Sequence, residues 1–254
     1  MGKFGWAYIG NGNIARSTAN DIMKGEHKIV SVYGRNIQKA RAFAEKYGAT
    51  AFDDFDKAVM CDGVDAVYIA TPHTSHLEYA IRAMKLGKAV LCEKPVGVSL
   101  AEAQKMIETA KQENVYFCEA MWTWFSDVAL TVKKWVLGGE IGEIKDVQIN
   151  YAFPGILMPK TSRVLTPETA GGALLDIGIY PITYCYNLFG YPKTISCKGK
   201  IKKAKSWLMV AASRLTRENA SIRLFISASA AFTASAHLAF AFKRLSVRAT
   251  SYQG

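Results

Sequence analysis

The sequence lacks closely spaced cysteines. Its five cysteines are widely spaced and form no C-x-x-C pair: Cys61, Cys92, Cys118, Cys185 and Cys197. An odd number without such pairs argues against a disulfide framework and against a zinc site. We therefore expect no metal site, and we interpret the cysteines as reduced, buried side chains of a cytoplasmic protein.

The N-terminus lacks the basic region and the long apolar run of a signal peptide, because it begins "MGKFGWAYIG". We therefore expect no signal peptide. Of the 254 residues, 50% are hydrophobic and 21% are charged. This composition is typical of a globular protein, and the length favours two domains.

Acidic residues are nearly absent from the last part of the chain. Residues 200–254 contain ten Lys or Arg but one acid, Glu218, whereas residues 1–199 contain 22 Lys or Arg and 20 acids. Most of the formal net charge of +11 therefore lies in this tail. A basic tail can bind nucleic acid or an anionic surface. Because this one has no motif of a nucleic-acid-binding fold, we expect no nucleic-acid partner.

Turn-forming residues are missing from the tail as well, since residues 201–253 contain no Gly, Pro or Asp. An antiparallel sheet needs such residues between its strands, so we expect a helix packed on the body, or no regular structure. The 19 uncharged residues Leu224–Phe242 have the length of a membrane span, but seven of them are alanine. We therefore expect no membrane partner.

The first 120 residues alternate short β-branched runs with longer amphipathic runs. S-x-x-E capping boxes at Ser75 and Ser99 open two of the amphipathic runs. Strand–helix alternation at this spacing predicts an α/β fold, a Rossmann-type doubly wound parallel sheet with helices on both faces. The predicted strands are 3–9, 28–34, 65–70, 88–93 and 115–120, and the predicted helices are 13–24, 36–47, 75–86 and 99–113.

The pattern changes after residue 121. A helix is predicted at 126–137, and the alternating segment 143–153 predicts an antiparallel strand. A helical run at 171–190, interrupted by Pro181, and a further strand at 193–201 follow. This order indicates an α+β domain after the α/β domain.

The segment "YIGNGNIA" (8–15) ends the first predicted strand with a G-x-G-x-x-A motif. The first glycine permits a tight turn, the second lets a pyrophosphate approach the backbone, and the alanine keeps the next helix close to the sheet. The N–H groups at the start of that helix are available to the anion. The motif predicts a dinucleotide site that includes Gly10, Asn11, Gly12, Asn13 and Ile14.

The end of the second predicted strand distinguishes between two dinucleotides. An NAD site usually places an acid about 20 residues after the glycines, where it accepts from the ribose 2′-OH. Here the segment reads "VSVYGRN" and contains no acid. Arg35 can bind a 2′-phosphate through its guanidinium fork, so NADP is favoured over NAD. A surface arginine at a helix start is the alternative interpretation.

Two further segments follow predicted strands at the edge where open α/β sheets bind ligands. In "ATPHTSH" (70–76), Thr71 and Pro72 end one strand, and His76 is either a ligand contact or a capping or surface group. In "CEKPVGVS" (92–99), Lys94 ends the next strand. Its ammonium can donate to a substrate hydroxyl or carbonyl, but a surface Glu93–Lys94 pair fits the pattern equally well.

Five segments occur in a fixed order: "GNGNIA", "ATP" with His76, "CEKPVGVS", "EAMWTWF" and "GGALLDIGIYP". Together they resemble the glucose–fructose oxidoreductase / inositol dehydrogenase / MocA family. Within that family the chain is most similar to the group of trans-1,2-dihydrobenzene-1,2-diol dehydrogenases and NADP-dependent D-xylose 1-dehydrogenases. The resemblance covers residues 3–200.

The resemblance implies roles for several residues. Lys94 matches the active-site lysine, and its bond to Pro95 would be cis. Asp176 and Tyr180 match a D-x-x-x-H/Y pair, in which the tyrosine exchanges the hydroxyl proton and the aspartate orients the substrate. Lys94 would polarise the reacting oxygen. The expected cofactor contacts beyond the glycine motif are Arg35, Thr71, Pro72, His76, Glu93 and Lys94.

The expected function is an NADP-dependent dehydrogenase that transfers a hydride between the nicotinamide and a hydroxyl-bearing carbon of a sugar, another polyol or a cyclic trans-diol. The resemblance implies an open antiparallel sheet in the second domain and a homodimer through it. We expect a dinucleotide-binding domain at 1–121, a partial substrate and dimerisation domain at 122–201, and the basic Ala/Ser-rich tail at 202–254. The family continues with turn-punctuated strands after residue 201. A reading-frame slip in the tail, with an incomplete sheet and an impaired relative that binds dinucleotide, is therefore the alternative.

Overall fold

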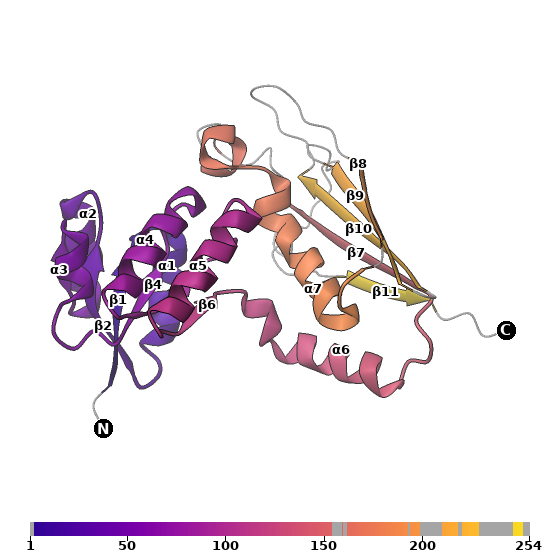
Figure 1. Cartoon of the computed structure of the whole chain (residues 1–254), viewed down its shortest axis with the longest axis horizontal. Helices are drawn as coiled ribbons and strands as arrows, with labels where there is room; N and C mark the ends of the chain where they lie inside the picture. Colours follow the sequence, from indigo (N-terminus) through magenta and orange to yellow (C-terminus); the bar gives the residue numbers. More distant parts are fainter. Residues whose placement is uncertain are drawn as a thin grey trace, which may run out of the picture. The chain divides into compact units, whose positions relative to one another are not determined.

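The structure is a computed structural model that describes residues 3–153, 159, 162–192, 194–198, 210–217, 220–228 and 246–250. The chain divides into two compact units, Met1–Met121 and Trp122–Gly254. Each unit has its own sheet (Figure 1).

The first unit contains a six-stranded parallel sheet with the order β3-β2-β1-β4-β5-β6. The two central strands, β1 and β4, are the point at which the winding changes direction. The prediction of a Rossmann-type α/β fold is therefore confirmed. The strands are β1 (Phe4–Ile9), β2 (His27–Tyr33), β3 (Thr50–Phe52), β4 (Ala66–Ile69), β5 (Ala89–Cys92) and β6 (Phe117–Glu119).

Helices cover both faces of this sheet, and a separate apolar cluster fills each face. Within β4, Val67 and Ile69 belong to one cluster and Tyr68 to the other, because successive side chains of a strand point to opposite faces. The first cluster also contains residues of α3, α4 and α5, and the second contains residues of α1 and α2. The helices are α1 (Asn13–Ile22), α2 (Ile37–Tyr47), α3 (Phe55–Val59), α4 (His76–Lys85) and α5 (Leu100–Gln112).

One of the two predicted capping boxes opens its helix as expected. The Ser99 hydroxyl accepts a hydrogen bond from the Glu102 N–H at 3.2 Å and caps α5. Ser75 makes no such cap on α4. Its hydroxyl donates to Thr71 Oγ1 and to the Pro72 carbonyl instead, so the prediction at Ser75 is wrong. The turn before the helix competes for that hydroxyl.

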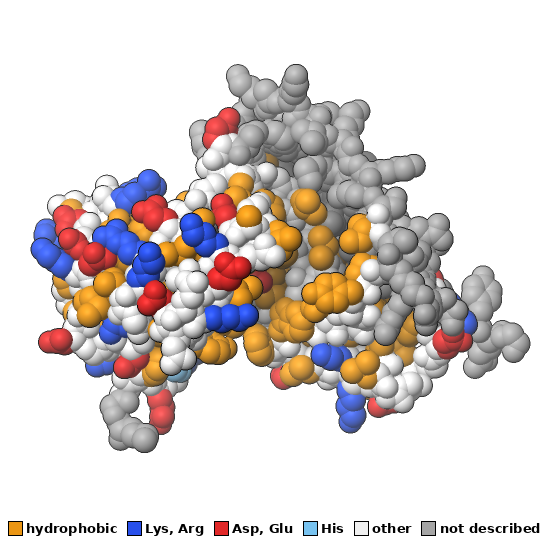
Figure 2. Space-filling view, viewed as in Figure 1, with side chains coloured by type: hydrophobic (Ala, Val, Ile, Leu, Met, Phe, Trp, Pro, Cys, Tyr) orange, Lys and Arg blue, Asp and Glu red, His pale blue; other side chains and the backbone are white. Residues whose placement is uncertain are grey.

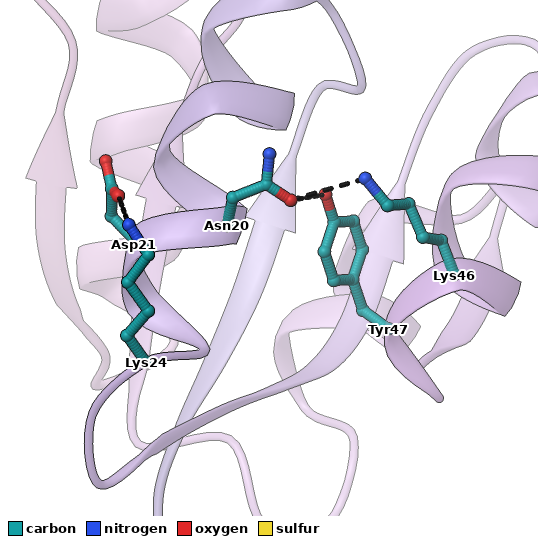
Figure 3. A network of polar contacts seen from close by, with 5 residues as sticks. All are labelled: Asn20, Asp21, Lys24, Lys46 and Tyr47. Carbon is teal, nitrogen blue, oxygen red and sulfur yellow. Dashed lines mark hydrogen bonds and ion pairs between the residues drawn. The ribbon is translucent and has the colours of Figure 1, made fainter.

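Polar contacts join α1 and α2 near the C-terminal ends of both helices (Figure 3). Asn20 Oδ1 accepts from the Tyr47 hydroxyl at 2.9 Å and from Lys46 Nζ at 3.3 Å. An exposed ion pair between Lys24 and Asp21 ends α1. Exposed contacts of this kind contribute less than about 1 kcal/mol each, so the apolar cluster beneath them holds the two helices.

The second unit contains a five-stranded sheet with the order β11-β7-β10-β9-β8. The strands β7 and β10 pair in parallel, and the other pairs are antiparallel. The α+β prediction is confirmed, but the sheet is mixed rather than wholly antiparallel. Its strands are β7 (Asp146–Phe153), β8 (Thr194–Lys198), β9 (Val210–Arg217), β10 (Ala220–Ala228) and β11 (Ser246–Thr250).

The strands β9, β10 and β11 correct our expectation of a helix, or of no regular structure, in the tail. In β10, apolar Ile222, Leu224 and Ile226 alternate with other residues, which is the period of a strand. Arg217 of β9 pairs with Ala220 of β10, so only Glu218 and Asn219 separate the two strands in sequence.

Two helices pack against this sheet, α6 (Asp127–Gly138) and α7 (Ile179–Phe189). Their contact with β7 is an apolar cluster of Ala129, Val147, Ile149, Tyr184, Cys185 and Leu188. A π-helical segment, η6 (Leu174–Gly178), leads directly into α7. Pro181 therefore lies within the first turn of an unbroken helix, where its missing N–H is tolerated, rather than interrupting one.

The remaining described elements are short. They are the 3₁₀ turns η1 (His73–Ser75), η2 (Trp122–Trp124), η4 (Arg163–Leu165) and η5 (Pro167–Thr169). In the part of the chain that the structure describes, no helix has the length and the apolar character of a membrane span.

Candidate functional site

The turn after β1 depends on glycine at its first position. Gly10 has φ +104°, and a Cβ added there would lie 2.8 Å from the Ala70 carbonyl oxygen. The Gly10 N–H donates to the Tyr33 carbonyl at 2.9 Å. The turn is therefore fixed between the carboxyl ends of β2 and β4, and a side chain would displace it.

The start of α1 has the features that an anion requires. Gly12 is the N-cap residue, and no side chain caps the helix. A Cβ added to Gly12 would meet no atom within 4 Å, so a phosphate can approach the backbone there. Side chains do cap α2, α3, α5 and α6. The predicted residues Asn11, Gly12, Asn13 and Ile14 are half-buried or exposed at this turn, and they fit a pyrophosphate.

Arg35 lies two residues after the end of β2, and its side chain is exposed. The next residue, Asn36, caps α2 by accepting from the Lys39 N–H at 3.0 Å. A Cβ added to Gly34 would lie 3.2 Å from the Asn11 side-chain amide, so the turns after β1 and β2 are in contact. Arg35 is thus a cation at the same sheet edge as the glycine turn.

The turn after β4 contains Thr71, Pro72 and His76. Thr71 and Pro72 are half-buried, and both accept from the Ser75 hydroxyl. The His76 side chain is buried, with Nδ1 3.0 Å from the Pro95 carbonyl oxygen and Nε2 3.0 Å from the Thr71 carbonyl oxygen. His76 therefore connects the turn after β4 with the turn after β5.

Lys94 lies in the turn after β5, and its peptide bond to Pro95 is cis, as the resemblance implied. The Lys94 side chain is half-buried, and the Glu93 side chain is buried. Glu93 Oε2 accepts from the Lys94 N–H at 3.2 Å, and Glu93 Oε1 accepts from the Tyr68 hydroxyl at 2.5 Å. The carboxylate thus contacts protein donors on both oxygens.

Two more carboxylates bind the same turn. Glu119 Oε1 accepts from the Val96 N–H at 2.8 Å, and Glu102 Oε2 accepts from the Val98 N–H at 2.9 Å. Burial raises the pKa of Glu119, and the Glu93 charge acts in the same direction, whereas the bond from Val96 and the Lys94 charge lower it. The backbone N–H groups of residues 94, 96 and 98 therefore each donate to a carboxylate.

In the second unit, Asp176 lies in the π-helical segment η6 and Tyr180 in the first turn of α7. The Tyr180 ring contacts two other rings, Tyr151 of β7 at 5.2 Å and Trp122 of η2 at 6.0 Å between centroids. Burial, followed by the charges of Tyr180 and Asp176, raises the pKa of Tyr151. Tyr180 and Asp176 therefore belong to one cluster with Tyr151.

Sequence reasoning missed four residues around these groups: Tyr68, Glu119, Tyr151 and Trp122. The segment "EAMWTWF" contains Glu119 and Trp122 and was recognised as a motif, but nothing in it indicated their contacts. Tyr68 was one apolar residue of a buried strand. No group of three His, Cys, Asp or Glu side chains that could hold a metal ion is found among the described residues.

Two family models match the chain. The model described as "Oxidoreductase family, NAD-binding Rossmann fold" matches residues 4–120, and the model of the "GFO/IDH/MocA C-terminal domain" matches residues 129–251. The second match reaches into the tail, whereas the resemblance seen in the sequence covered only residues 3–200.

Curated relatives match over most of the chain. A trans-1,2-dihydrobenzene-1,2-diol dehydrogenase of Mus musculus is 31% identical over 77% of this chain and 60% of its own length. A D-xylose 1-dehydrogenase (NADP(+)) of Hypocrea jecorina is 32% identical over 71% of this chain and 52% of its own length. The chain therefore spans little more than half the length of these relatives.

A solved structure has the same fold. The aldose–aldose oxidoreductase of Caulobacter crescentus, complexed with glycerol, superimposes with a TM-score of 0.81. It is 24% identical, and the match covers 89% of this chain and 71% of that one.

Proposed function

Because the chain belongs to the GFO/IDH/MocA oxidoreductase family, we propose that it is an NADP-dependent dehydrogenase. The reaction is hydride transfer between the nicotinamide and a hydroxyl-bearing carbon of a sugar, another polyol or a cyclic trans-diol. The names of the curated relatives support this substrate class, since they act on a dihydrodiol and on D-xylose.

The turn that contains Lys94 is the observation that carries the proposal. β1, β4 and β5 are neighbours in one parallel sheet, so the turns after them lie at the same edge. That edge is where open α/β sheets bind ligands. An amine in a turn at the same sheet edge as an uncapped helix start and a glycine turn is suited to polarise an oxygen next to a dinucleotide.

The cofactor would lie along the turns that end β1, β2, β4 and β5. The glycine turn and the N-terminus of α1 would bind the pyrophosphate, and the Arg35 guanidinium would bind the 2′-phosphate of NADP. Thr71, Pro72 and the Lys94 turn would line the nicotinamide side. Bound NADP supplies the carbon that accepts or donates the hydride.

The remaining roles belong to three side chains. Lys94 donates to the reacting oxygen and stabilises the charge that develops there. Tyr180 takes up or returns the hydroxyl proton, and Asp176 accepts hydrogen bonds from the other hydroxyls of the substrate. Trp122 and Tyr151, which contact the Tyr180 ring, keep its orientation.

Replacement of Lys94 by alanine tests the proposal. We expect turnover of D-xylose or trans-1,2-dihydrobenzene-1,2-diol with NADP to fall by at least about a hundredfold, the usual contribution of a positioned proton donor. NADPH affinity, followed by its fluorescence, should stay within threefold, the mark of a lost transition-state contact. Lys85→Ala, on the exposed surface of α4, is the control and should keep full activity.

Unchanged turnover in Lys94→Ala would remove the role assigned to this lysine. A purified chain that binds NADPH but converts none of a panel of sugars, other polyols and cyclic trans-diols would be the impaired relative instead. Equal affinity for NADH and NADPH would argue against the role of Arg35.

We also propose that the protein is cytoplasmic and forms a homodimer through the sheet of the second unit. The odd number of cysteines and the lack of a C-x-x-C pair support the first statement. Analytical ultracentrifugation checks the second. The hypothesis of a frame slip in the tail stays a prediction, which translation of the nucleotide sequence in its other frames decides.

A further inference from the structure

We propose that Tyr68 is a positioning residue for Lys94 and acts through the Glu93 carboxylate. This inference rests on the proposed function, because it concerns the lysine that the reaction is expected to use. It gives Glu93 a different task from cofactor contact, which was the sequence-based expectation.

Tyr68 is a buried hydrogen-bond donor aimed at Glu93. It lies in β4, its side chain is 1% exposed, and its hydroxyl donates to Glu93 Oε1 at 2.5 Å. Burial raises the pKa of Tyr68, and the Glu93 charge acts in the same direction. The hydroxyl therefore keeps its proton and can only donate toward the carboxylate.

Glu93 passes this constraint to the backbone of Lys94. Glu93 is 8% exposed, and its Oε2 accepts from the Lys94 N–H at 3.2 Å. A buried carboxylate that loses a donor is strongly destabilised, so it moves or takes up a proton. Either change weakens its bond to the Lys94 N–H and changes where the lysine side chain starts.

The rest of the turn is held by other groups, which confines the change to Lys94. The Pro95 carbonyl lies 3.0 Å from His76 Nδ1, and the Val96 N–H donates to Glu119. The Val98 N–H donates to Glu102. Because none of these contacts involves Tyr68, we expect them to hold the rest of the turn in a Tyr68 variant, so that the change is greatest at the Lys94 N–H.

The neighbouring strand offers a matched control, Tyr8. Tyr8 pairs directly with Tyr68 between β1 and β4, and the two ring centroids are 4.9 Å apart. The Tyr8 hydroxyl is also buried, but the hydroxyl that donates to Glu93 is that of Tyr68 and not that of Tyr8. Tyr8→Phe and Tyr68→Phe thus remove the same atom from the same core, and only the second removes a donor from Glu93.

The experiment compares Tyr68→Phe with Tyr8→Phe in the full chain. We expect Tyr68→Phe to lower kcat by about tenfold to a hundredfold, the usual effect of misplacing a reacting group, with NADPH affinity unchanged. Tyr8→Phe should keep kcat within twofold. If Tyr68 were needed only for folding, the loss of kcat would be accompanied by a lower thermal midpoint. Both quantities are therefore measured on the same samples.

A second measurement does not depend on turnover. The rate at which acetic anhydride modifies Lys94, relative to exposed Lys85, is followed by peptide mass spectrometry. We expect this ratio to change more than twofold in Tyr68→Phe and to stay constant in Tyr8→Phe. If neither the unchanged protein nor any variant turns over a substrate, the proposed function fails. The modification ratio would still test whether Tyr68 positions Lys94.

Equal kcat values and equal modification ratios in the two phenylalanine variants would overturn the proposal. If Tyr68→Phe does not fold, Glu93→Gln takes its place, because it keeps the shape of the side chain but removes its charge. The same changes in kcat and in the ratio are expected there. A tenfold loss of NADPH affinity in Glu93→Gln, with the Lys94 ratio unchanged, would instead identify Glu93 as a cofactor contact.

Discussion

The two units hold their candidate catalytic side chains by different means. In the first unit, carboxylates and a histidine bind the backbone around Lys94. In the second unit, aromatic rings surround Tyr180. Hydrogen bonds fix a backbone in one arrangement, whereas ring contacts tolerate small shifts. The backbone around Lys94 is therefore fixed by directed hydrogen bonds, and the ring of Tyr180 by contacts with other rings.

The surfaces of the two units also differ, in the kind of side chain that they expose. Figure 2 shows charged side chains scattered over the first unit and apolar side chains gathered over part of the second. In the second unit several exposed large apolar residues lie on α6 or just before it, and others lie on η6, α7 and β8. Those on α6 or just before it are Trp122, Phe125, Val128, Leu130, Trp135 and Leu137. Single exposed apolar residues are ordinary, but a group of this kind on one helix is not.

The largest expected effect is on the first unit. Gly10→Ala should lower the free energy of unfolding by about 4 kcal/mol, because it adds backbone strain to a collision. The φ of +104° disfavours any side chain, and the new Cβ would lie 2.8 Å from the Ala70 carbonyl oxygen. Urea unfolding with and without NADPH measures the loss.

Gly48→Ala is the control for this substitution. Gly48 also has a positive φ, +66°, but a Cβ there meets no atom within 4 Å. We expect a loss of about 1 kcal/mol from backbone strain alone. Equal losses at both glycines would show that the contact with Ala70 does not fix the cofactor turn.

The next effect is on the second unit. Tyr180→Phe should lower kcat by about a hundredfold or more, because it removes the hydroxyl that we propose exchanges the proton and keeps the ring contacts. Tyr184→Phe, one turn further along α7 and in the apolar cluster, is the matched control. Steady-state rates with NADP and the polyol panel measure both. A comparable loss of kcat in the two variants would mean that α7 is disturbed as a whole.

The smallest effect is a pH dependence of the first unit. Burial lowers the pKa of His76 from 6.5, and the charge of His73 acts in the same direction, while the Thr71 and Pro95 carbonyls only partly oppose them. The folded state thus binds a proton less readily than the unfolded state. This contribution to the free energy of unfolding is complete above about pH 6.5 and is lost as the pH falls below it.

Thermal midpoints at pH 7.5, 6.5 and 5.5 measure this change. In His76→Gln the loss on acidification should be smaller than in the unchanged protein, since the variant has no imidazole to protonate. An identical pH dependence of the two proteins would exclude His76 as its source.

The order of the elements in the first unit could be predicted from sequence because each long run has a clear period. The helix α1 and the glycine turn follow from spacing alone. The strand β3 was missed, since three residues are too few for a period to show. In the second unit, the helix containing Tyr180 was predicted, but the π-helical segment that leads into it was not.

The contacts of the site residues were harder to predict than their places. Lys94 was found because strand, turn and motif coincide. The bond from Tyr68 to Glu93 depends on which residues of β4 and β5 lie side by side. The sequence of a single strand does not give its register with a neighbouring strand. The same holds for Tyr151, which meets Tyr180 only through the packing of α7 on β7.

The three carboxylates that bind the N–H groups of residues 94, 96 and 98 have a consequence for the redesign of this protein. Each carboxylate comes from a different part of the first unit, so the spacing of the N–H groups is matched to fixed partners. An insertion or deletion of one residue there would put two of the three N–H groups out of reach. We therefore expect this turn not to tolerate a change of length, so redesign should keep its number of residues.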